Sequence, residues 1–407
     1  MRHDFGTRAP RDGGGILSQF SPNERDFLAG LKRRDVESLT DCLSAKRARG
    51  ETTMTTPPLR IGVLKSNLPD DAKRDIFATL RDNGSEKYVS WVVRLLCLPL
   101  DRLSPPPKRS LSMSEQVAGA QKLLDSVIIG HSGAKKEILK LVCQDVMKPE
   151  ASRSYALGFE GPPGVGKTRL VHDAVGPALC KPVITVSLGG ATDSAFLLGQ
   201  LYTYEGSKEG RLAAGLIEAG VMDPIFHFDE LDKVSSTDRG QEITNTLIHL
   251  IDPTCNMALR DRYFHGVDID FSRCTFLFTY NDASRVNPVL LDRIKRIRMD
   301  KPTSQECEDI VRAHVVPRLC QRYGVKYELG TDTVRELVRL QSDGMRGVER
   351  SVEDVFGEAL LASATETTPI QADGTIDAHF ASRVLAARST DGAAHRRCAA
   401  PPPFMYT

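Results

Sequence analysis

The sequence predicts an α/β fold in which a parallel sheet is sandwiched between helices, with a short helical segment before it and a small all-helical lid after it. Three observations lead to this prediction. Apolar runs of strand length alternate with helix-spaced apolar residues between residues 113 and 300. Residues 161–168 form a glycine-rich loop between an expected strand and an expected helix. After residue 301 the strand pattern stops and only helical spacing continues.

The chain divides into five parts on this basis. We expect a disordered tail over 1–58, a helical segment over 59–112, an α/β domain over 113–300, a helical lid over 301–388 and a second disordered tail over 389–407. Both tails contain clusters of residues that are typical of loops. The basic cluster at 46–49 is short, so a solvated tail is a better interpretation of it than a targeting or nucleic-acid patch.

Two helices are expected in the segment before the sheet. The first covers 70–80, and its apolar face is formed by Ala72, Ile76, Phe77 and Leu80. The second lies within 86–100 and contains Trp91, the only tryptophan of the chain, which we expect to pack in a core. Residues 104–108, with three consecutive prolines, should then form a stiff linker.

The elements of the two later parts follow from their apolar spacing. Five short segments are expected to be strands, namely 155–159, 182–187, 224–230, 274–279 and 296–299. Helices are expected within 114–147, with the second one over 134–147, and over 210–219 and 242–252. A capping box of Thr303 and Glu306 should open a lid helix that runs to residue 323. Later lid elements are expected over 331–341, 348–362 and 375–386.

Composition excludes several classes of protein. The 54 basic and 53 acidic residues give a net charge of +1, which argues against a protein that mainly coats nucleic acid or an anionic membrane. No apolar run is long enough to span a bilayer, and the start of the chain lacks the apolar core of a signal peptide. Nine singly spaced cysteines indicate reduced thiols. We therefore expect an intracellular, cytoplasmic protein without a membrane segment.

The loop at 161–168 has the spacing G-x-x-x-x-G-K-[ST] of a phosphate-binding loop. Its glycines let backbone N–H groups close on phosphate oxygens, while Lys167 can reach the β- and γ-phosphates and the Thr168 hydroxyl can bind Mg²⁺. The helix that follows adds the positive end of its dipole. The residues expected to contact the nucleotide here are Gly161, Pro162, Pro163, Gly164, Val165, Gly166, Lys167 and Thr168.

Polar residues follow two of the expected strands. Asp229 and Glu230 end the strand 224–230, which places them at the edge of the sheet where phosphates would lie. Asp229 suits Mg²⁺, directly or through water, and Glu230 suits polarising an attacking water. Asn281 should emerge on the same edge and reach the γ-phosphate or that water, although an isolated asparagine there is more often a turn residue. His227, inside the strand, is expected to be a packed histidine.

Several short motifs resemble those of one protein family. Residues 61 to 386 resemble the ATPase module of Lon-type ATP-dependent proteases, in the AAA+ superfamily. The similar segments are 88–92, 187–190, 203–206 with Gly210 and Arg211, 229–233, 251–253 and 288–293. The resemblance implies that the fold is the P-loop AAA+ fold and that the nucleotide is ATP.

The resemblance also implies roles for residues that do not stand out by themselves. Ile129 and Gly130 would contact the adenine, and Asn281 would be the first sensor. Arg293 would be an arginine finger that reaches the nucleotide of the next subunit of a ring, expected to be a hexamer. Arg346, in the lid, would be the second sensor.

A pore loop is implied as well. Tyr204 would grip a threaded polypeptide, with the adjacent Glu205 in a place where the family usually has an aliphatic residue. A surface-loop tyrosine is the alternative interpretation.

The end of the chain departs from the family pattern. Lon proteases carry a C-terminal peptidase domain with a Ser-Lys dyad, whereas here the last lysine is Lys326 and 61 residues follow Arg346. We therefore expect no peptidase activity from this chain, and any peptidase would be a separate chain.

Three functions remain open at this point. The first is a ring-forming ATPase that hydrolyses ATP to remodel or unfold protein clients. The second is an ATP-binding regulatory or scaffold subunit with little threading, which Glu205 favours. The third is an AAA+ ATPase that acts on nucleic acid, which the balanced charge disfavours.

Overall fold

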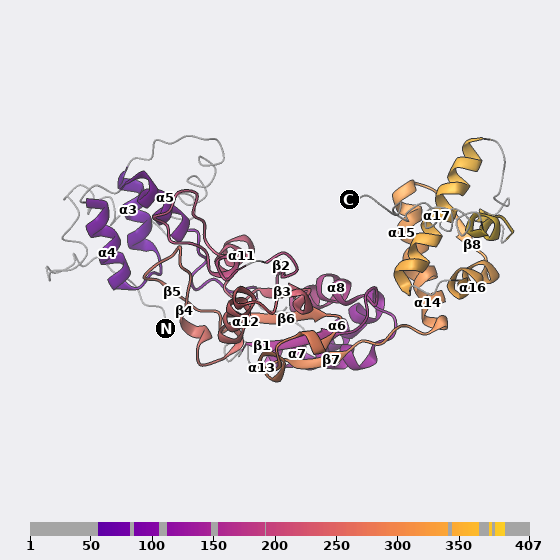
Figure 1. Cartoon of the computed structure of the whole chain (residues 1–407), viewed down its shortest axis with the longest axis horizontal. Helices are drawn as coiled ribbons and strands as arrows, with labels where there is room; N and C mark the ends of the chain where they lie inside the picture. Colours follow the sequence, from indigo (N-terminus) through magenta and orange to yellow (C-terminus); the bar gives the residue numbers. More distant parts are fainter. Residues whose placement is uncertain are drawn as a thin grey trace, which may run out of the picture.

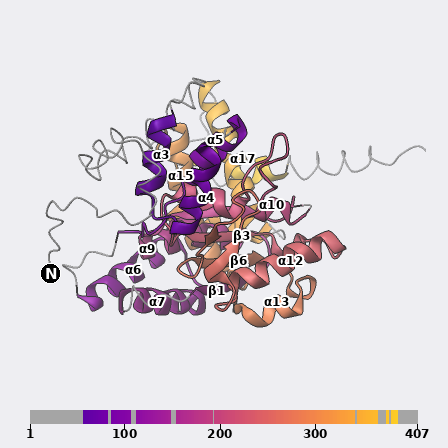
Figure 2. The same ribbon diagram turned by 90° about the vertical axis from the view of Figure 1, so that its left-hand side faces the viewer.

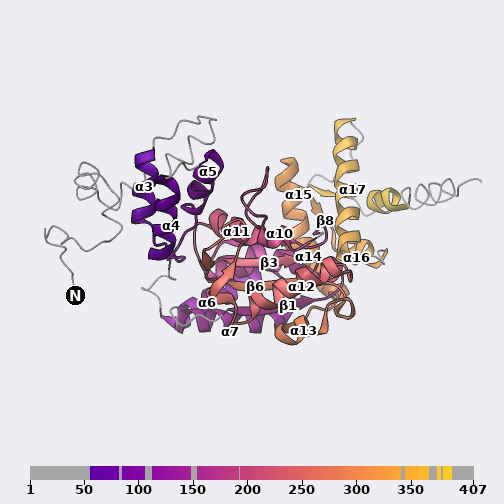
Figure 3. The same ribbon diagram turned by 60° about the vertical axis from the view of Figure 1, so that its left-hand side comes forward.

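The computed structural model describes residues 56–386 apart from 82–84, 106–111, 148–153, 192, 341–343, 366–373 and 377–378. An α/β domain lies at its centre, with the N-terminal helices over one end and the lid over the other (Figures 1 and 3). Almost all of the two predicted disordered tails, and most of the proline-rich linker, lie outside the described residues. No helix in the described part of the chain combines the length and apolar character that spanning a bilayer requires.

A five-stranded parallel sheet forms the α/β domain, with the strand order β2-β3-β6-β1-β7. Its strands are β1 (Tyr155–Glu160), β2 (Val183–Ser187), β3 (Ile225–Asp229), β6 (Thr275–Tyr280) and β7 (Lys295–Arg298). The predicted parallel sheet is thereby confirmed. Because the strands are parallel, their carboxyl ends share one edge, and β1, which lies between β6 and β7, delivers the glycine-rich loop to that edge.

Helices on one face of the sheet flank the glycine-rich loop. They are α6 (Met113–Val127), α7 (Ser132–Met147) and the helix after the loop, made of α8 (Lys167–Arg169), the π-helical segment η3 (Leu170–Val175) and α9 (Gly176–Leu179). Leu157 and Phe159 of β1, Ile225 of β3 and Leu277 of β6 are buried with these helices in one apolar cluster. Figure 2 shows the α6–α7 pair on one side of the strands and α12 on the other.

The opposite face is aromatic. Phe226 and Phe228 of β3 are in register with Phe276 and Phe278 of β6, and the paired ring centroids lie 6.3 and 5.1 Å apart. The covering elements are α11 (Arg211–Ala219), α12 (Asp238–Ile251), α13 (Pro288–Arg293) and the pair β4 (Leu259–Arg260) and β5 (Asp268–Ile269). Since both of their faces are buried, the central strands β3 and β6 have nearly continuous apolar runs instead of alternating ones.

Three helices precede the α/β domain and share the core of its aromatic face. They are α3 (Thr56–Lys65), α4 (Asp70–Arg81) and α5 (Glu86–Leu95). Trp91 is buried there and its indole N–H donates to the Tyr263 carbonyl at 2.5 Å, which confirms the predicted core position. The predicted tail to residue 58 is wrong at its end, because α3 already begins at Thr56. Prolines at 57 and 58 fit the first turn of a helix, where no N–H partner is needed.

The lid is helical and has an apolar cluster of its own. Its elements are α14 (Ser304–Ile310), the π-helical segment η7 (Val311–Val315), α15 (Val316–Tyr323), α16 (Thr331–Leu340), α17 (Met345–Ala364) and the parallel pair β8 (Glu328–Leu329) and β9 (Thr375–Ile376). Residues 379–386 are also helical. The predicted capping box is confirmed, since the Glu306 N–H donates to Thr303 Oγ1 and the Thr303 N–H donates to Glu306 Oε2.

Two helices of the aromatic face differ from the predictions. Helix α12 begins at Asp238, four residues before the predicted start at 242, because its first turn is polar and carries no apolar repeat. Helix α13 has only six residues and was not predicted. Asn287 starts it by accepting the N–H groups of Val289 and Leu290, and Pro288 occupies its first turn.

Candidate functional site

The glycine-rich loop is shaped by backbone that other residues could not occupy. Gly164 and Gly166 have φ values of +84° and +90°, in the left-handed region that a side chain disfavours. The Gly161 N–H donates to the Tyr280 carbonyl at 3.2 Å, and a Cβ on Gly161 would collide with the Met299 carbonyl. The loop is therefore held between β6 and the end of β7, a position from which the N–H groups after Gly161 can close on a phosphate.

Lys167 lies at the centre of the site. Its amine donates to the carbonyls of Gly161 and Pro162 at 2.5 and 3.0 Å and to Asn281 Oδ1 at 2.9 Å. Burial lowers the pKa of this amine from its usual range, and the carboxylates of Asp232 and Asp229 oppose that shift. Protein oxygens therefore accept the N–H donors of the Lys167 amine that phosphate oxygens would accept when a nucleotide binds.

Asp229 and Glu230 end β3 beside the loop. Asp229 Oδ1 accepts the Thr279 hydroxyl at 2.5 Å and the Glu230 N–H at 3.0 Å. Glu230 is exposed, has a φ of +59°, and its carboxylate lies against Gly189 at the end of β2. A non-glycine residue in this left-handed conformation costs about 1 kcal/mol, so the surrounding structure holds Glu230 there against a local preference.

Asn281 is joined to this group by a residue that the sequence did not single out. Asp232 is 6 % exposed, and its Oδ2 accepts the Asn281 N–H at 3.2 Å. Its Oδ1 is buried without a hydrogen-bond partner among the described residues. Asp232 is the second aspartate of 229–233 and lies in the short helix η4 (Leu231–Lys233), a position that strand spacing alone does not distinguish.

His227 lies in the interior of the sheet below Asp229. It is fully buried, and its Nε2 is 3.1 Å from Thr279 Oγ1. Burial lowers the pKa of His227 to about 4, which the nearby Asp229 opposes and His172 reinforces. His227 is therefore a packed, neutral histidine, as the sequence predicts.

Ile129 and Gly130, the residues predicted to contact the adenine, lie where the α/β domain meets the lid. Gly130 has a φ of +75°, and a Cβ there would strike the carboxylate of Glu306. Ile129 is partly buried beside it. His131, which the sequence did not single out, is hydrogen-bonded to the Val165 backbone, and burial lowers its pKa while Glu306 opposes this. The segment 129–131 thus bridges the loop and α14.

The two predicted arginines lie in different places. Arg346, near the start of α17, places its Cγ 3.0 Å from where a Cβ of Gly164 would be, so the lid touches the loop directly. Arg293 lies at the end of α13, donates to the Val289 carbonyl at 3.1 Å and is 4.0 Å from Asp252. The structure brings Arg346 to the loop and leaves Arg293 apart from it.

The predicted pore loop is exposed at its tip and held at its neck. Tyr204 is 62 % exposed, and Glu205 is also exposed. At the neck the Gln200 N–H donates to the Lys208 carbonyl at 3.2 Å, and the Gly210 N–H donates to Asp261 Oδ2 at 2.8 Å. The segment 199–210 is therefore a closed loop with a fixed base.

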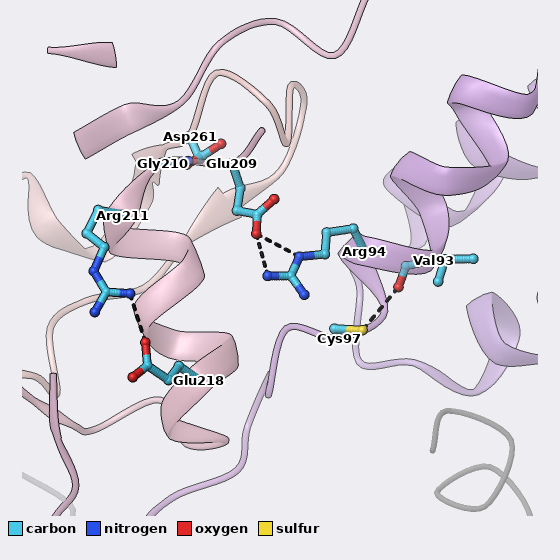
Figure 4. A network of polar contacts seen from close by, with 8 residues as sticks. All are labelled: Val93, Arg94, Cys97, Glu209, Gly210, Arg211, Glu218 and Asp261. Atoms are coloured by element: carbon cyan, nitrogen blue, oxygen red, sulfur yellow. Dashed lines mark hydrogen bonds and ion pairs between the residues drawn. The ribbon is translucent and has the colours of Figure 1, made fainter. Parts of the chain in front are cut away.

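Helix α5 contacts both sides of that neck. Arg94 donates through Nε to Glu209 Oε1 at 2.7 Å, and the two side chains face each other across the gap between α5 and the loop (Figure 4). The Trp91 ring stacks at a tilt on Tyr202, with centroids 5.6 Å apart. These long-range contacts could not be inferred from local spacing.

The residues at the loop fit a nucleoside triphosphate with Mg²⁺. The glycine backbone leaves space that a Cβ would fill, Lys167 offers donors for phosphate oxygens, and Thr168 and Asp229 offer the oxygen ligands that Mg²⁺ takes. Within the described residues, only Oδ1 of the Asp229 carboxylate is hydrogen-bonded.

Comparison with known proteins agrees with this site. Residues 157–301 match the family model described as "ATPase family associated with various cellular activities (AAA)". The chain is 36% identical over 256 residues to a Lon protease homolog of Acanthamoeba polyphaga mimivirus, which covers 61% of this chain and 25% of the relative. It is 30% identical over 362 residues to the Lon protease of Salinispora arenicola, and this match covers 86% of this chain and 45% of the relative. It is 32% identical over 298 residues to the peroxisomal Lon protease homolog 2 of Arabidopsis thaliana, and this match covers 72% of this chain and 32% of the relative. The chain spans less than half the length of these three relatives.

Proposed function

Because this chain carries an AAA+ ATPase module of Lon type, we propose that it hydrolyses ATP to ADP and phosphate in a ring, expected to be a hexamer, and thereby remodels or unfolds protein clients. The observation that supports hydrolysis best is the convergence of Lys167, Asn281 and Asp229 on one edge of the sheet, with Glu230 beside them. Phosphoryl transfer needs such separated groups, because catalysis there is mostly positioning and charge stabilisation.

Each residue has a distinct task in this proposal. The loop N–H groups and Lys167 bind the β- and γ-phosphates and stabilise the charge that develops on them. Mg²⁺, held by Thr168 and Asp229, would neutralise phosphate charge. The Glu230 carboxylate orients the attacking water and accepts its proton, and Asn281 fixes the position of that water or of the γ-phosphate.

Ring assembly accounts for the position of Arg293. Its distance from the loop in its own chain suits an arginine finger that reaches the nucleotide of a neighbouring subunit, a contribution of about 10³- to 10⁵-fold in rate. Arg346 would act within its own chain, since it already lies on the loop. Tyr204 on the exposed loop tip would grip the client, and a peptidase, if one takes part, would be a separate chain.

The test is ATP turnover by the full chain. The Glu230→Gln variant should retain ATP binding and lose at least about 100-fold in turnover, since it keeps the shape of the side chain but not the base. The exposed Glu328→Gln on β8 is the matched control and should behave as the wild type. Equal turnover in the wild type and Glu230→Gln would reject the proposal.

One observation favours a second candidate function. Glu205 puts a charge beside Tyr204 at the exposed loop tip, which weakens an apolar grip on a polypeptide. The alternative is an ATP-binding regulatory or scaffold subunit with little threading. It predicts that Tyr204→Ala leaves client handling unchanged, whereas the first proposal predicts loss of client unfolding with ATP turnover retained.

A further inference from the structure

A chain of polar side chains, buried at His227 and Thr279, runs along one face of the sheet and ends on Asp229. It starts at Thr185 of β2, whose hydroxyl lies 2.8 Å from His172 Nε2. The same His172 nitrogen lies 3.4 Å from His227 Nδ1, and the two rings meet edge to face. His227 Nε2 is 3.1 Å from Thr279 Oγ1, which is 2.5 Å from Asp229 Oδ1. Of these groups, the proposed function uses only Asp229.

Sheet geometry explains why these side chains meet. Thr185 is paired with His227 in the β2–β3 register, and residues two apart on a strand point to the same face. His227 and Asp229 therefore share the face that η3 covers, and His172 descends from η3 onto His227. A polar cluster here replaces what would otherwise be apolar packing between the loop helix and the sheet.

The chemistry of the groups determines the direction of the hydrogen bonds. An ionised carboxylate only accepts, so the single hydrogen of the Thr279 hydroxyl is donated to Asp229. Thr279 Oγ1 must then accept from His227 Nε2–H. That tautomer leaves Nδ1 of the neutral His227 ring as an acceptor, which faces His172 Nε2. Every donor between His227 and the carboxylate thus points toward Asp229.

We propose that His227, acting through the Thr279 hydroxyl, is a positioning residue that holds the Asp229 carboxylate in the orientation in which it binds Mg²⁺. Thr279 and His227 are 1 % and 0 % exposed, so water does not substitute for either partner. Buried polar groups are costly unless they are satisfied, and here Asp229 is the group that completes the chain. This inference rests on the proposed role of Asp229 in the ATPase.

The test measures nucleotide affinity against free Mg²⁺ in the full chain carrying Glu230→Gln, so that hydrolysis is slow during the titration. A fluorescent ATP analogue is titrated at a series of Mg²⁺ concentrations and again in EDTA. Thr279→Val should raise the Mg²⁺ concentration for half-maximal tightening about 10- to 100-fold, the usual effect of removing a group that orients a metal ligand. His227→Leu should shift it in the same direction by less, because the hydroxyl remains. In EDTA both variants should bind as the parent does.

Matched variants separate positioning from damage to the fold. Thr279→Ser keeps the hydroxyl and should restore the Mg²⁺ response. Thr275→Val makes the Thr-to-Val change at another buried position, at the start of β6, and should have no effect on that response. A Thr279→Val variant with an unchanged Mg²⁺ response overturns the inference, as does an equal loss of affinity in EDTA. If the parent itself shows no Mg²⁺-dependent binding, it is the proposed function that fails.

Discussion

At the scale of single residues, Asp232 supports two others in the nucleotide site. Its carboxylate holds the backbone of Asn281 and raises the pKa of Lys167 against the effect of burial. Asp232→Asn keeps the shape but removes the charge, so we expect ATP turnover to fall about 10- to 100-fold. The exposed Asp71→Asn is the control. An Asp232→Asn enzyme with wild-type turnover would show that the carboxylate has only a packing role.

Asp261, at the neck of the predicted pore loop, gives a prediction about pH. Burial raises its pKa to about 6, although three backbone N–H groups oppose the shift. Because the folded-state pKa lies above the unfolded value, the folded state takes up a proton first, and stability from this group increases as the pH falls through 6. Between pH 7 and pH 5 the wild type should gain about 1 kcal/mol of unfolding free energy relative to Asp261→Asn.

Denaturant unfolding of both proteins at pH 7, 6 and 5 measures this difference. The comparison with Asp261→Asn removes the contribution of other titrating groups, which change both proteins alike. A difference that stays constant over this range, or that falls with the pH, would contradict the raised pKa.

The positions of candidate site residues were predictable where these residues follow one another in the sequence. The glycine-rich loop and the pair Asp229 and Glu230 follow from spacing and from one apolar strand. Asp232, His131 and the contact of Thr279 with Asp229 were not predicted, because each depends on atoms brought together from separate elements. The roles of Asn281, Arg293 and Arg346 remain predictions.

At the scale of elements, the loop 199–210, the predicted pore loop, is joined to α5 through Arg94 and Glu209. Arg94→Glu places two like charges at the neck and should slow client unfolding roughly fivefold while ATP turnover stays near the wild type. The swapped pair Arg94→Glu with Glu209→Arg should recover most of the lost rate. Arg322→Glu, in a surface ion pair of the lid with Glu353, is the control.

Client unfolding and ATP turnover are measured in parallel on the same preparations, with hydrogen exchange of residues 199–210 as a direct report on the loop. If Arg94→Glu unfolds clients as fast as the wild type, α5 does not position the loop. Failure of the swapped pair to recover would mean that the two changes act separately.

Element prediction succeeded where burial repeats along the chain. The central strands β3 and β6 are nearly continuous apolar runs, and the ends of all five strands were predicted to within about one residue. Helix α13 was missed because six residues contain less than two turns of pattern. The π-helical segments η3 and η7 were missed because they change the hydrogen-bond spacing without changing which residues are apolar.

At the scale of the whole molecule, the proposed ring would bring Arg293 of one subunit to the nucleotide of its neighbour. A mixture of Glu230→Gln and Arg293→Ala chains tests whether the missing group comes from a neighbour. Each variant alone should turn over ATP slowly. When subunits mix at random, about one quarter of the interfaces combine an intact Glu230 with an intact Arg293, so turnover should recover to about one quarter of the wild type.

The wild type should also lose specific activity on dilution, as subunits separate. A mixture that stays as slow as its components, although it forms mixed assemblies, would contradict transfer of Arg293 between subunits. Mixing Glu230→Gln with Lys167→Ala is the control, because both changes affect the site of one chain and neither removes the arginine.

The separate apolar cluster of the lid has a mechanical consequence. Helices α3 to α5 share a core with the sheet, so pulling them away would expose buried residues such as Leu59 and Trp91. The lid cluster contains no residue of the α/β domain, so the lid can turn about the strand-to-helix connection after β7 without exposing apolar surface. Its resting angle is then set by small contacts, Glu306 on Gly130 and Arg346 on Gly164. A nucleotide bound between those contacts would fix the angle of the lid relative to the sheet, and its hydrolysis would allow the lid to rotate.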